Sequence, residues 1–134
     1  MNTSAHTSLF TLKNVLLINA VSSGITGVAL IALASQVASL FGVTEIQAFL
    51  ETGIFLVAFA AFVSYEGMRH SLRVKNIYVI IVLDIVWVIA SAAIVVPQLF
   101  DLTAIGYIAI SAVALWVAAM AYLQLQGVRQ ISAA

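Results

Sequence analysis

One carboxylate stands inside an apolar stretch of the sequence. The segment "IYVIIVLDIVWVIAS", residues 77–91, contains Asp84, with Trp87 three residues and Ser91 seven residues further on. In a helix this spacing places the three side chains on one face. A carboxyl group is costly in lipid, so we expect Asp84 to face other helices, either protonated or hydrogen-bonded. Asp84 is therefore a candidate for coupling a proton or cation to a function, and equally for a structural hydrogen bond.

A second polar face precedes it in the chain. Asn19, Ser22, Ser23 and Thr26 follow the spacing i, i+3, i+4 and i+7, so a helix presents them together. Small hydroxylated residues let helices approach closely and bond across the interface, which favours a packing role. A solute path lined by the same hydroxyls is the alternative. Asn19 is expected at the depth of Asp84, and we predict a hydrogen bond between the two.

Two further polar residues, Glu66 and Gln124, are expected in the half of the bilayer that also holds Asn19 and Asp84. Glu66 has Arg69 one turn later, a spacing typical of an ordinary interfacial ion pair. Gln124 occupies the corresponding end of the last apolar segment. Together with Asn19 and Asp84 these residues form a predicted polar layer. The layer is either a vestibule for an ion or substrate, or a set of buried contacts that hold the helices together.

Both tryptophans fall where tryptophan is uncommon in membrane proteins. Trp87 and Trp116 are expected near the bilayer midplane, whereas this residue prefers the interfaces. Filling of the core is one interpretation. The other is an aromatic-walled pocket beside a carboxylate, suited to a lipophilic cation, with Phe55, Phe59 and Phe62 completing its wall. A quinone or pigment held between the tryptophans is a third hypothesis.

The sequence lacks the residues that several kinds of catalysis require. The two histidines, His6 and His70, fall in the N-terminal tail and in a link, so a pair of axial haem ligands is missing. The sequence has no cysteine, and no Ser/His/Asp set, metal-binding cluster or phosphate loop is evident. We therefore expect a protein that is not an enzyme and has no resident cofactor or metal.

The composition requires these residues to be carried on membrane-spanning helices. The 134 residues are 64% hydrophobic and only 7% charged, against about 25% charged in a soluble domain. Apolar runs at 14–40, 47–68, 77–98 and 103–127 can each cross a hydrocarbon core, and lipid forces such runs to be helical. Short links make neighbours antiparallel. We predict an all-α integral membrane protein, one up-down-up-down four-helix domain over residues 1–134.

The ends of the predicted helices carry typical signals, and the two halves resemble each other. Asn76 is a candidate cap for the third helix, while Pro97 followed by Asp101 or Thr103 separates the third from the fourth. "LFGVT" at 40–44 returns as "LFDLT" at 99–103, and "EGMR" at 66–69 returns as "QGVR" at 126–129. The offsets of 59 and 60 residues predict a duplicated helical hairpin in parallel orientation.

The basic residues predict an orientation. Five Lys or Arg side chains all fall at the termini or in the middle link, and the other two links and their edges carry only acidic residues. The basic set is Lys13, Arg69, Arg73, Lys75 and Arg129, and the acidic set is Glu45, Glu51 and Asp101. The positive-inside rule then places both termini in the cytoplasm. The balanced net charge gives no reason to expect a nucleic-acid partner.

The pattern resembles a group of small bacterial membrane proteins of four helices with no assigned function. The resemblance rests on "NAVSSGITG", "LFG", "DIVWVIAS" and "LQLQGVR", which begin at residues 19, 40, 84 and 123. It implies the bacterial cytoplasmic (inner) membrane and no biochemical role. The small multidrug resistance transporters are similar in length and helix count, but they bear their essential carboxylate on the first helix, where this chain has Asn19.

Three functions follow as hypotheses. The first is a non-enzymatic membrane protein that acts by binding, as an accessory subunit of a larger membrane complex or as a binder of lipid or another hydrophobic ligand. The alternative is a small transporter coupled to protons or cations through Asp84, and the third is a membrane anchor that binds quinone or pigment. A homo-oligomer is also expected, through small residues on the last helix, namely Ser111, Ala114, Ala118 and Ala121.

Overall fold

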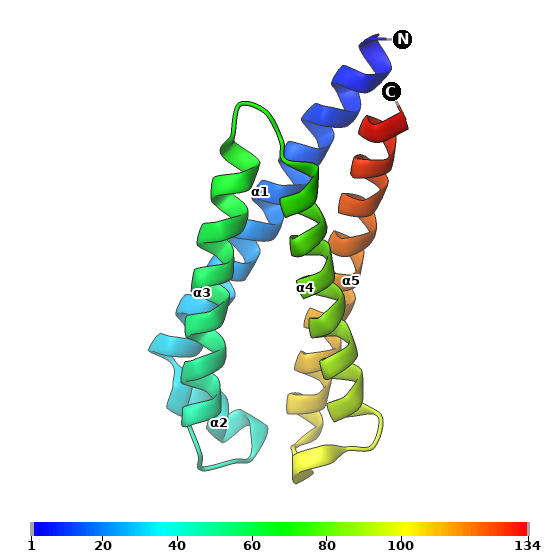
Figure 1. Ribbon diagram of the computed structural model, residues 1–134. Coiled ribbons are helices and arrows are strands. Elements are labelled where there is room, and N and C mark those ends of the chain that lie inside the picture. Colours follow the sequence, from blue (N-terminus) through cyan, green and yellow to red (C-terminus); the bar gives the residue numbers. More distant parts are fainter. Residues whose placement is uncertain (1, 134) are drawn as a thin grey trace.

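The computed structural model describes residues 2–133, and this part of the chain is helical with short links and no strand. Four long helices and two short ones follow in the order α1 Asn2–Ala32, α2 Ala34–Phe41, α3 Gln47–Met68, α4 Val74–Val95, the 3-10 helix η1 Leu99–Asp101 and α5 Ala104–Ala133. The long helices α1, α3, α4 and α5 run up and down in turn (Figure 1). The predicted all-α four-helix bundle is confirmed.

Each long helix contains a segment able to cross a membrane. The segments are Thr11–Ala32, Gln47–Met68, Val74–Val95 and Ala104–Ile131. Large apolar side chains point outward along them, such as Ile25, Val82 and Leu115, which are 66%, 55% and 73% exposed. An exterior this apolar suits hydrocarbon and not water. The chain is a multi-pass membrane protein.

The first helix differs from the prediction of one helix over 14–40. α1 already begins at Asn2, and it is interrupted at Leu33, whose backbone leaves the helical region (φ −116°, ψ 28°), before α2 begins. An unbroken helix to Phe41 would be roughly 60 Å long, about twice the hydrocarbon thickness. The break lets α2 turn aside from α1 and bury Ala34 and Ala38.

The later helix limits also differ in part. α3 matches the prediction, but α4 spans 74–95 instead of 77–98, and it ends shortly before Pro97, which has no N–H to continue the helical hydrogen bonds. Asn76 is therefore inside α4 and not its cap. α5 runs past residue 127 to Ala133, and Thr103 caps its start by accepting the Gly106 N–H at 3.2 Å.

α1 and α3 form the tightest pair in the bundle. At their crossing, a Cβ placed on Gly53 would lie 2.7 Å from the Gly27 oxygen, and one placed on Gly27 would lie 2.8 Å from the Gly53 oxygen. Such distances exclude any side chain at either position. One turn earlier on α1 the fit is looser, since a Cβ on Gly24 would meet that of Ala60 at 3.5 Å. Two facing glycines therefore set the distance between these helices.

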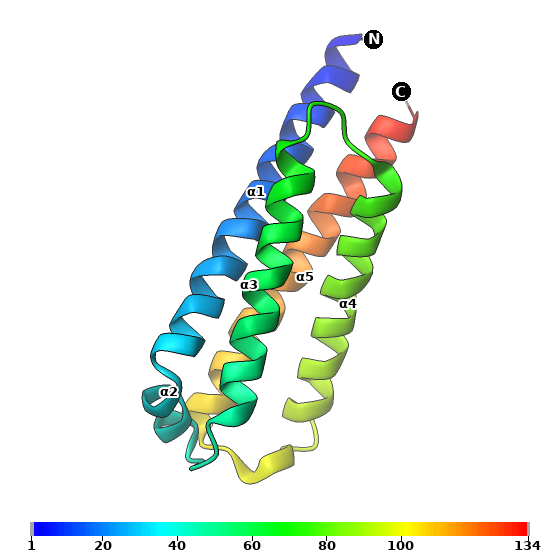
Figure 2. The same cartoon turned by 60° about the vertical axis from the view of Figure 1, so that its left-hand side comes forward.

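The second hairpin, α4 with α5, packs on the first in an asymmetric way. α5 lies against α1, whereas α3 and α4 barely touch although a short link joins them. Both views show this separation, with α3 and α4 apart along their length (Figures 1 and 2). The apolar core gathers at the end that holds the termini and this link, around the fully buried Leu16, Val63 and Ile80.

The two predicted repeats correspond only in part: "EGMR" lies at the end of α3, whereas "QGVR" lies inside α5. Gly42 and Asp101, which align in "LFGVT" and "LFDLT", both have a left-handed backbone, with φ of 78° and 54°. The two segments also bond to each other: the Thr103 N–H donates to the Phe41 oxygen at 3.1 Å, and its hydroxyl donates to the Leu40 oxygen at 2.6 Å. The neighbouring residues differ, since Phe100 is also left-handed (φ 69°) whereas Phe41 is helical, so the duplicated hairpin stays a prediction. The unequal α1–α5 and α3–α4 contacts break its symmetry.

Candidate functional site

A buried polar triad joins three helices near the middle of the bundle. Asn19 of α1, Asp84 of α4 and Gln124 of α5 are 1%, 3% and 0% exposed. The Asn19 Nδ2 donates to Asp84 Oδ2 at 3.0 Å and to Gln124 Oε1 at 2.8 Å, and Gln124 Nε2 donates to the same Asp84 Oδ2 at 2.9 Å. The predicted bond between Asn19 and Asp84 is therefore present, with Gln124 as a third partner.

The hydrogen bonds of the triad continue along α1 towards its C-terminal end. The Ser23 hydroxyl donates to Asn19 Oδ1 at 3.3 Å, so both ends of the Asn19 amide are used. The carboxyl of Asp84 receives two amide donors and is enclosed by the helices that supply them. Both donors go to Oδ2, and this arrangement stabilises contact between the three helices.

A cavity of about 300 Å³ adjoins the triad and is lined from all four long helices. Its wall includes Ser22, Ser23 and Thr26 of α1, Leu56 of α3, Trp87 of α4 and Trp116 of α5, with small and branched side chains of α5 between them. The polar face predicted on α1 and both tryptophans therefore meet at one place. The wall is mainly apolar, with hydroxyls on one side.

Most polar groups of this wall have hydrogen-bond partners, and one does not. The Trp116 Nε1 donates to the Ser22 Oγ at 3.1 Å, and Ser22 donates to the Ile18 oxygen at 2.8 Å. Thr26 donates to the Ser22 oxygen at 2.8 Å. The Trp87 Nε1 is buried and has no hydrogen-bond partner among residues 2–133. One donor beside the cavity is thus left without an acceptor.

The structure does not bring every predicted residue to this cavity. Phe55 is 46% exposed and stacks on Phe59, which belongs to the apolar core, and Phe62 packs against the same core. The phenylalanine stripe therefore does not complete an aromatic pocket, because α3 turns Leu56 towards the cavity instead. Asp84 faces the triad, and Ser91 is buried on α4 outside the cavity lining.

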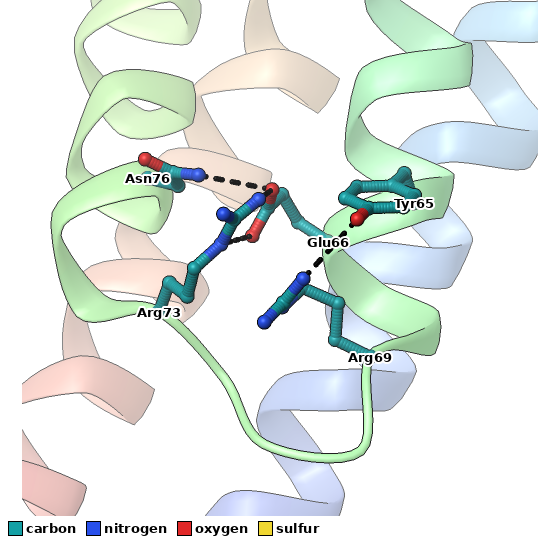
Figure 3. Close-up of polar contacts among 5 residues, drawn as sticks. All are labelled: Tyr65, Glu66, Arg69, Arg73 and Asn76. Carbon is teal, nitrogen blue, oxygen red and sulfur yellow. Dashed lines mark hydrogen bonds and ion pairs between the residues drawn. The ribbon is translucent and has the colours of Figure 1, made fainter.

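A separate polar cluster lies where α3 meets α4 (Figure 3). The carboxylate of Glu66 is fully buried and accepts from Arg73 Nε at 3.2 Å and from Asn76 Nδ2 at 3.0 Å, with a further contact to the Arg73 Nη2. The predicted pair with Arg69 is wrong: Arg69 donates to the Tyr65 hydroxyl at 3.2 Å instead. Glu66 therefore ties α3 to α4 and is not part of one layer with the triad.

The small-residue stripe of the last helix is partly covered within the chain. Ala121 is only 7% exposed, so it faces the bundle and not the lipid. Ser111, Ala114 and Ala118 are half-buried. The outer face assumed for the stripe is thus narrower than predicted, and self-association through it stays a prediction.

Fold and site together define a multi-pass α-helical membrane protein with an internal polar triad and an adjacent cavity. No family model, curated protein or solved structure matches the chain. Among the described residues there is no group of three or more His, Cys, Asp or Glu side chains that would hold a metal ion. The function must therefore be inferred from the cavity and its wall.

Proposed function

We propose that this protein acts by binding, without catalysis, and that its cavity between the four helices receives a hydrophobic ligand from the membrane. The observation that carries the proposal is the buried, unpartnered N–H of Trp87 beside a cavity of about 300 Å³. A buried donor without an acceptor costs free energy, and such groups are rare in folded proteins. A ligand that enters the cavity and accepts this hydrogen bond would remove the cost.

The size and lining of the cavity agree with this function. Ligand pockets commonly measure about 300–1,000 Å³ and combine an apolar wall with a few polar groups. Here tryptophan, leucine and valine side chains supply the apolar wall, and three hydroxyls supply the polar part. The cavity is partly open at the surface of the bundle, which supports access from the lipid side.

A cavity-filling substitution tests the proposal. Val113 lines the cavity, so Val113→Phe is expected to occupy it, whereas Leu115→Phe adds similar bulk at a side chain that is 73% exposed. We expect decylubiquinone to quench the tryptophan fluorescence of the wild-type protein in a saturable way, with saturable quenching lost in Val113→Phe and kept in Leu115→Phe. Quenching that rises linearly without saturation in the wild type would contradict binding in this cavity.

We further propose a bacterial inner-membrane location with both termini in the cytoplasm. Both termini and the α3–α4 link lie at one end of the bundle (Figure 1), and all five Lys and Arg residues fall at this end. Positive charge favours the cytoplasmic side. The sequence has no cysteine, so single cysteines can be introduced as labelling sites. An impermeant thiol reagent added outside should label Glu45→Cys and leave Ser71→Cys unlabelled, and the reverse pattern would overturn this orientation.

A further inference from the structure

We infer that the polar group of the ligand is an uncharged hydrogen-bond acceptor, a carbonyl in the first instance, and not a cation. This inference rests on the proposed binding function and names the ligand class for the same cavity. It is carried by the state of the donors and acceptors in the cavity wall and by the enclosure of the nearest carboxyl group.

The cavity lining carries no charge that could pair with a cation. Asp84 precedes the lining residue Trp87 by three positions, yet it does not line the cavity, and the residue is only 3% exposed. Two amide donors already occupy its Oδ2. Glu66 is committed to Arg73 and Asn76 at the end of the bundle. No charged side chain is among the lining residues, so a bound cation would have no counter-ion.

The two tryptophan rings offer a cation only cation–π contact. Such contact recovers a small part of the free energy that is needed to move an isolated charge into an apolar site. Two indole rings therefore do not offset the transfer of a cation into this cavity. The aromatic wall suits a neutral lipophile with a flat or extended apolar body.

Most side-chain donors of the residues that line the cavity already have hydrogen-bond partners. The hydroxyl hydrogens of Ser22, Ser23 and Thr26 are all used, towards the Ile18 oxygen, Asn19 Oδ1 and the Ser22 oxygen. The N–H of Trp116 is used by Ser22. Among the side-chain donors of the residues that line the cavity, Trp87 Nε1 is the one without a partner in the described part of the chain. It carries almost no accessible surface, so a ligand reaches it only when the indole ring turns. A ligand matches this wall when it brings an acceptor and needs no strong donor or charge.

A carbonyl oxygen on a lipophilic body meets these demands. Two sources of this chemistry exist in membranes, a quinone ring and an acyl ester. Four probes with a ten-carbon chain separate the cases. Decylubiquinone carries quinone carbonyls, methyl decanoate carries an ester carbonyl as part of the chain, decylbenzene has no strong acceptor, and decyltriphenylphosphonium carries a charge. Decylubiquinone is measured by quenching of tryptophan fluorescence, and the other three by competition with it in the same detergent.

We expect Trp87→Phe to weaken the binding of decylubiquinone roughly fivefold, which is the effect of losing one hydrogen bond of about 1 kcal/mol. The affinity for decylbenzene should not change, because the phenylalanine ring keeps apolar contact with the probe. Trp116→Phe is the matched variant, and it should alter both probes by a similar factor because its N–H is engaged by Ser22. If Trp87→Phe also weakens the binding of methyl decanoate by a similar factor, an ester carbonyl is sufficient for recognition. If only the binding of decylubiquinone is weakened, the ligand is a quinone.

The outcomes separate this inference from the proposed function. If no neutral probe binds saturably to the wild type, the proposed function fails. If neutral probes bind but Trp87→Phe weakens decylbenzene and decylubiquinone alike, or if decyltriphenylphosphonium is the tightest probe, the inferred ligand class is wrong. Should Trp87→Phe not fold, the wild-type ranking decides alone: at least one carbonyl probe must bind more tightly than both decylbenzene and the phosphonium.

Discussion

Replacing Gly53 with alanine is expected to destabilise the protein strongly. The new Cβ would lie 2.7 Å from the Gly27 oxygen and 2.7 Å from the Ile31 Cγ1. The oxygen belongs to the backbone of α1, so relief requires the two helices to move apart. Overpacking of this kind typically costs about 1–3 kcal/mol, and more where backbone must shift. Alanine regains at most about 1 kcal/mol through its better helix propensity.

The control for this prediction is the same substitution one turn away from the tight contact. At Gly24 a new Cβ meets that of Ala60 at 3.5 Å, an ordinary contact, so Gly24→Ala should melt at or slightly above the wild-type temperature. Thermal unfolding in mild detergent, followed by circular dichroism, measures both variants. If the two alanines shift the melting temperature equally, helix propensity and not the Gly27–Gly53 contact controls stability here.

Substitutions of Asp84 are expected to lower the melting temperature, more for leucine than for asparagine. Leucine removes both acceptor oxygens, so one N–H of Asn19 and one of Gln124 lose the partner they have in the triad. An interhelical hydrogen bond in a membrane contributes about 0.6–2 kcal/mol, and two such bonds are lost. Asparagine keeps one acceptor oxygen for the same donors, and Asp84→Asn should therefore melt between Asp84→Leu and the wild type.

The same two variants separate a structural role from the transporter hypothesis. If Asp84 serves only the triad, Asp84→Asn should bind decylubiquinone like the wild type at every pH tested. If Asp84 couples a proton to binding, Asp84→Asn should fold normally but lose any pH-dependent response, because asparagine does not take up a proton there. An Asp84→Leu protein that equals the wild type in melting temperature and in binding would refute both roles.

The sequence was sufficient for the membrane class, the number of spans and the central hydrogen bond. Apolar length alone predicts the long helices, since backbone groups in lipid must bond within the helix. The pairing of Asn19 with Asp84 could be predicted because polar side chains at equal depth seek each other in lipid. In each case one strong physical requirement acts on a few residues.

Other features depend on how helices rotate and tilt, which composition does not determine. The choice of Arg73 over Arg69 as the partner of Glu66 follows from the direction in which the link leaves α3, although the seven-residue spacing across a short link could have indicated it. The facing glycines were visible in the sequence, but their pairing needs the crossing point of α1 and α3. Likewise, the inward direction of Leu56 in place of the phenylalanines is a matter of helix rotation.

The placement of polar ties between the two hairpins has a consequence for synthesis of the chain. α1 and α3 emerge first and already fit each other through glycines, so this hairpin can insert as a unit. Until α4 and α5 arrive, however, Asn19 lacks both Asp84 and Gln124. The nascent first half therefore leaves the two N–H groups of the Asn19 side chain without these partners, while its oxygen keeps the Ser23 hydroxyl. When α4 and α5 insert, Asp84 and Gln124 accept hydrogen bonds from Asn19. These bonds favour closure of the two hairpins into one bundle.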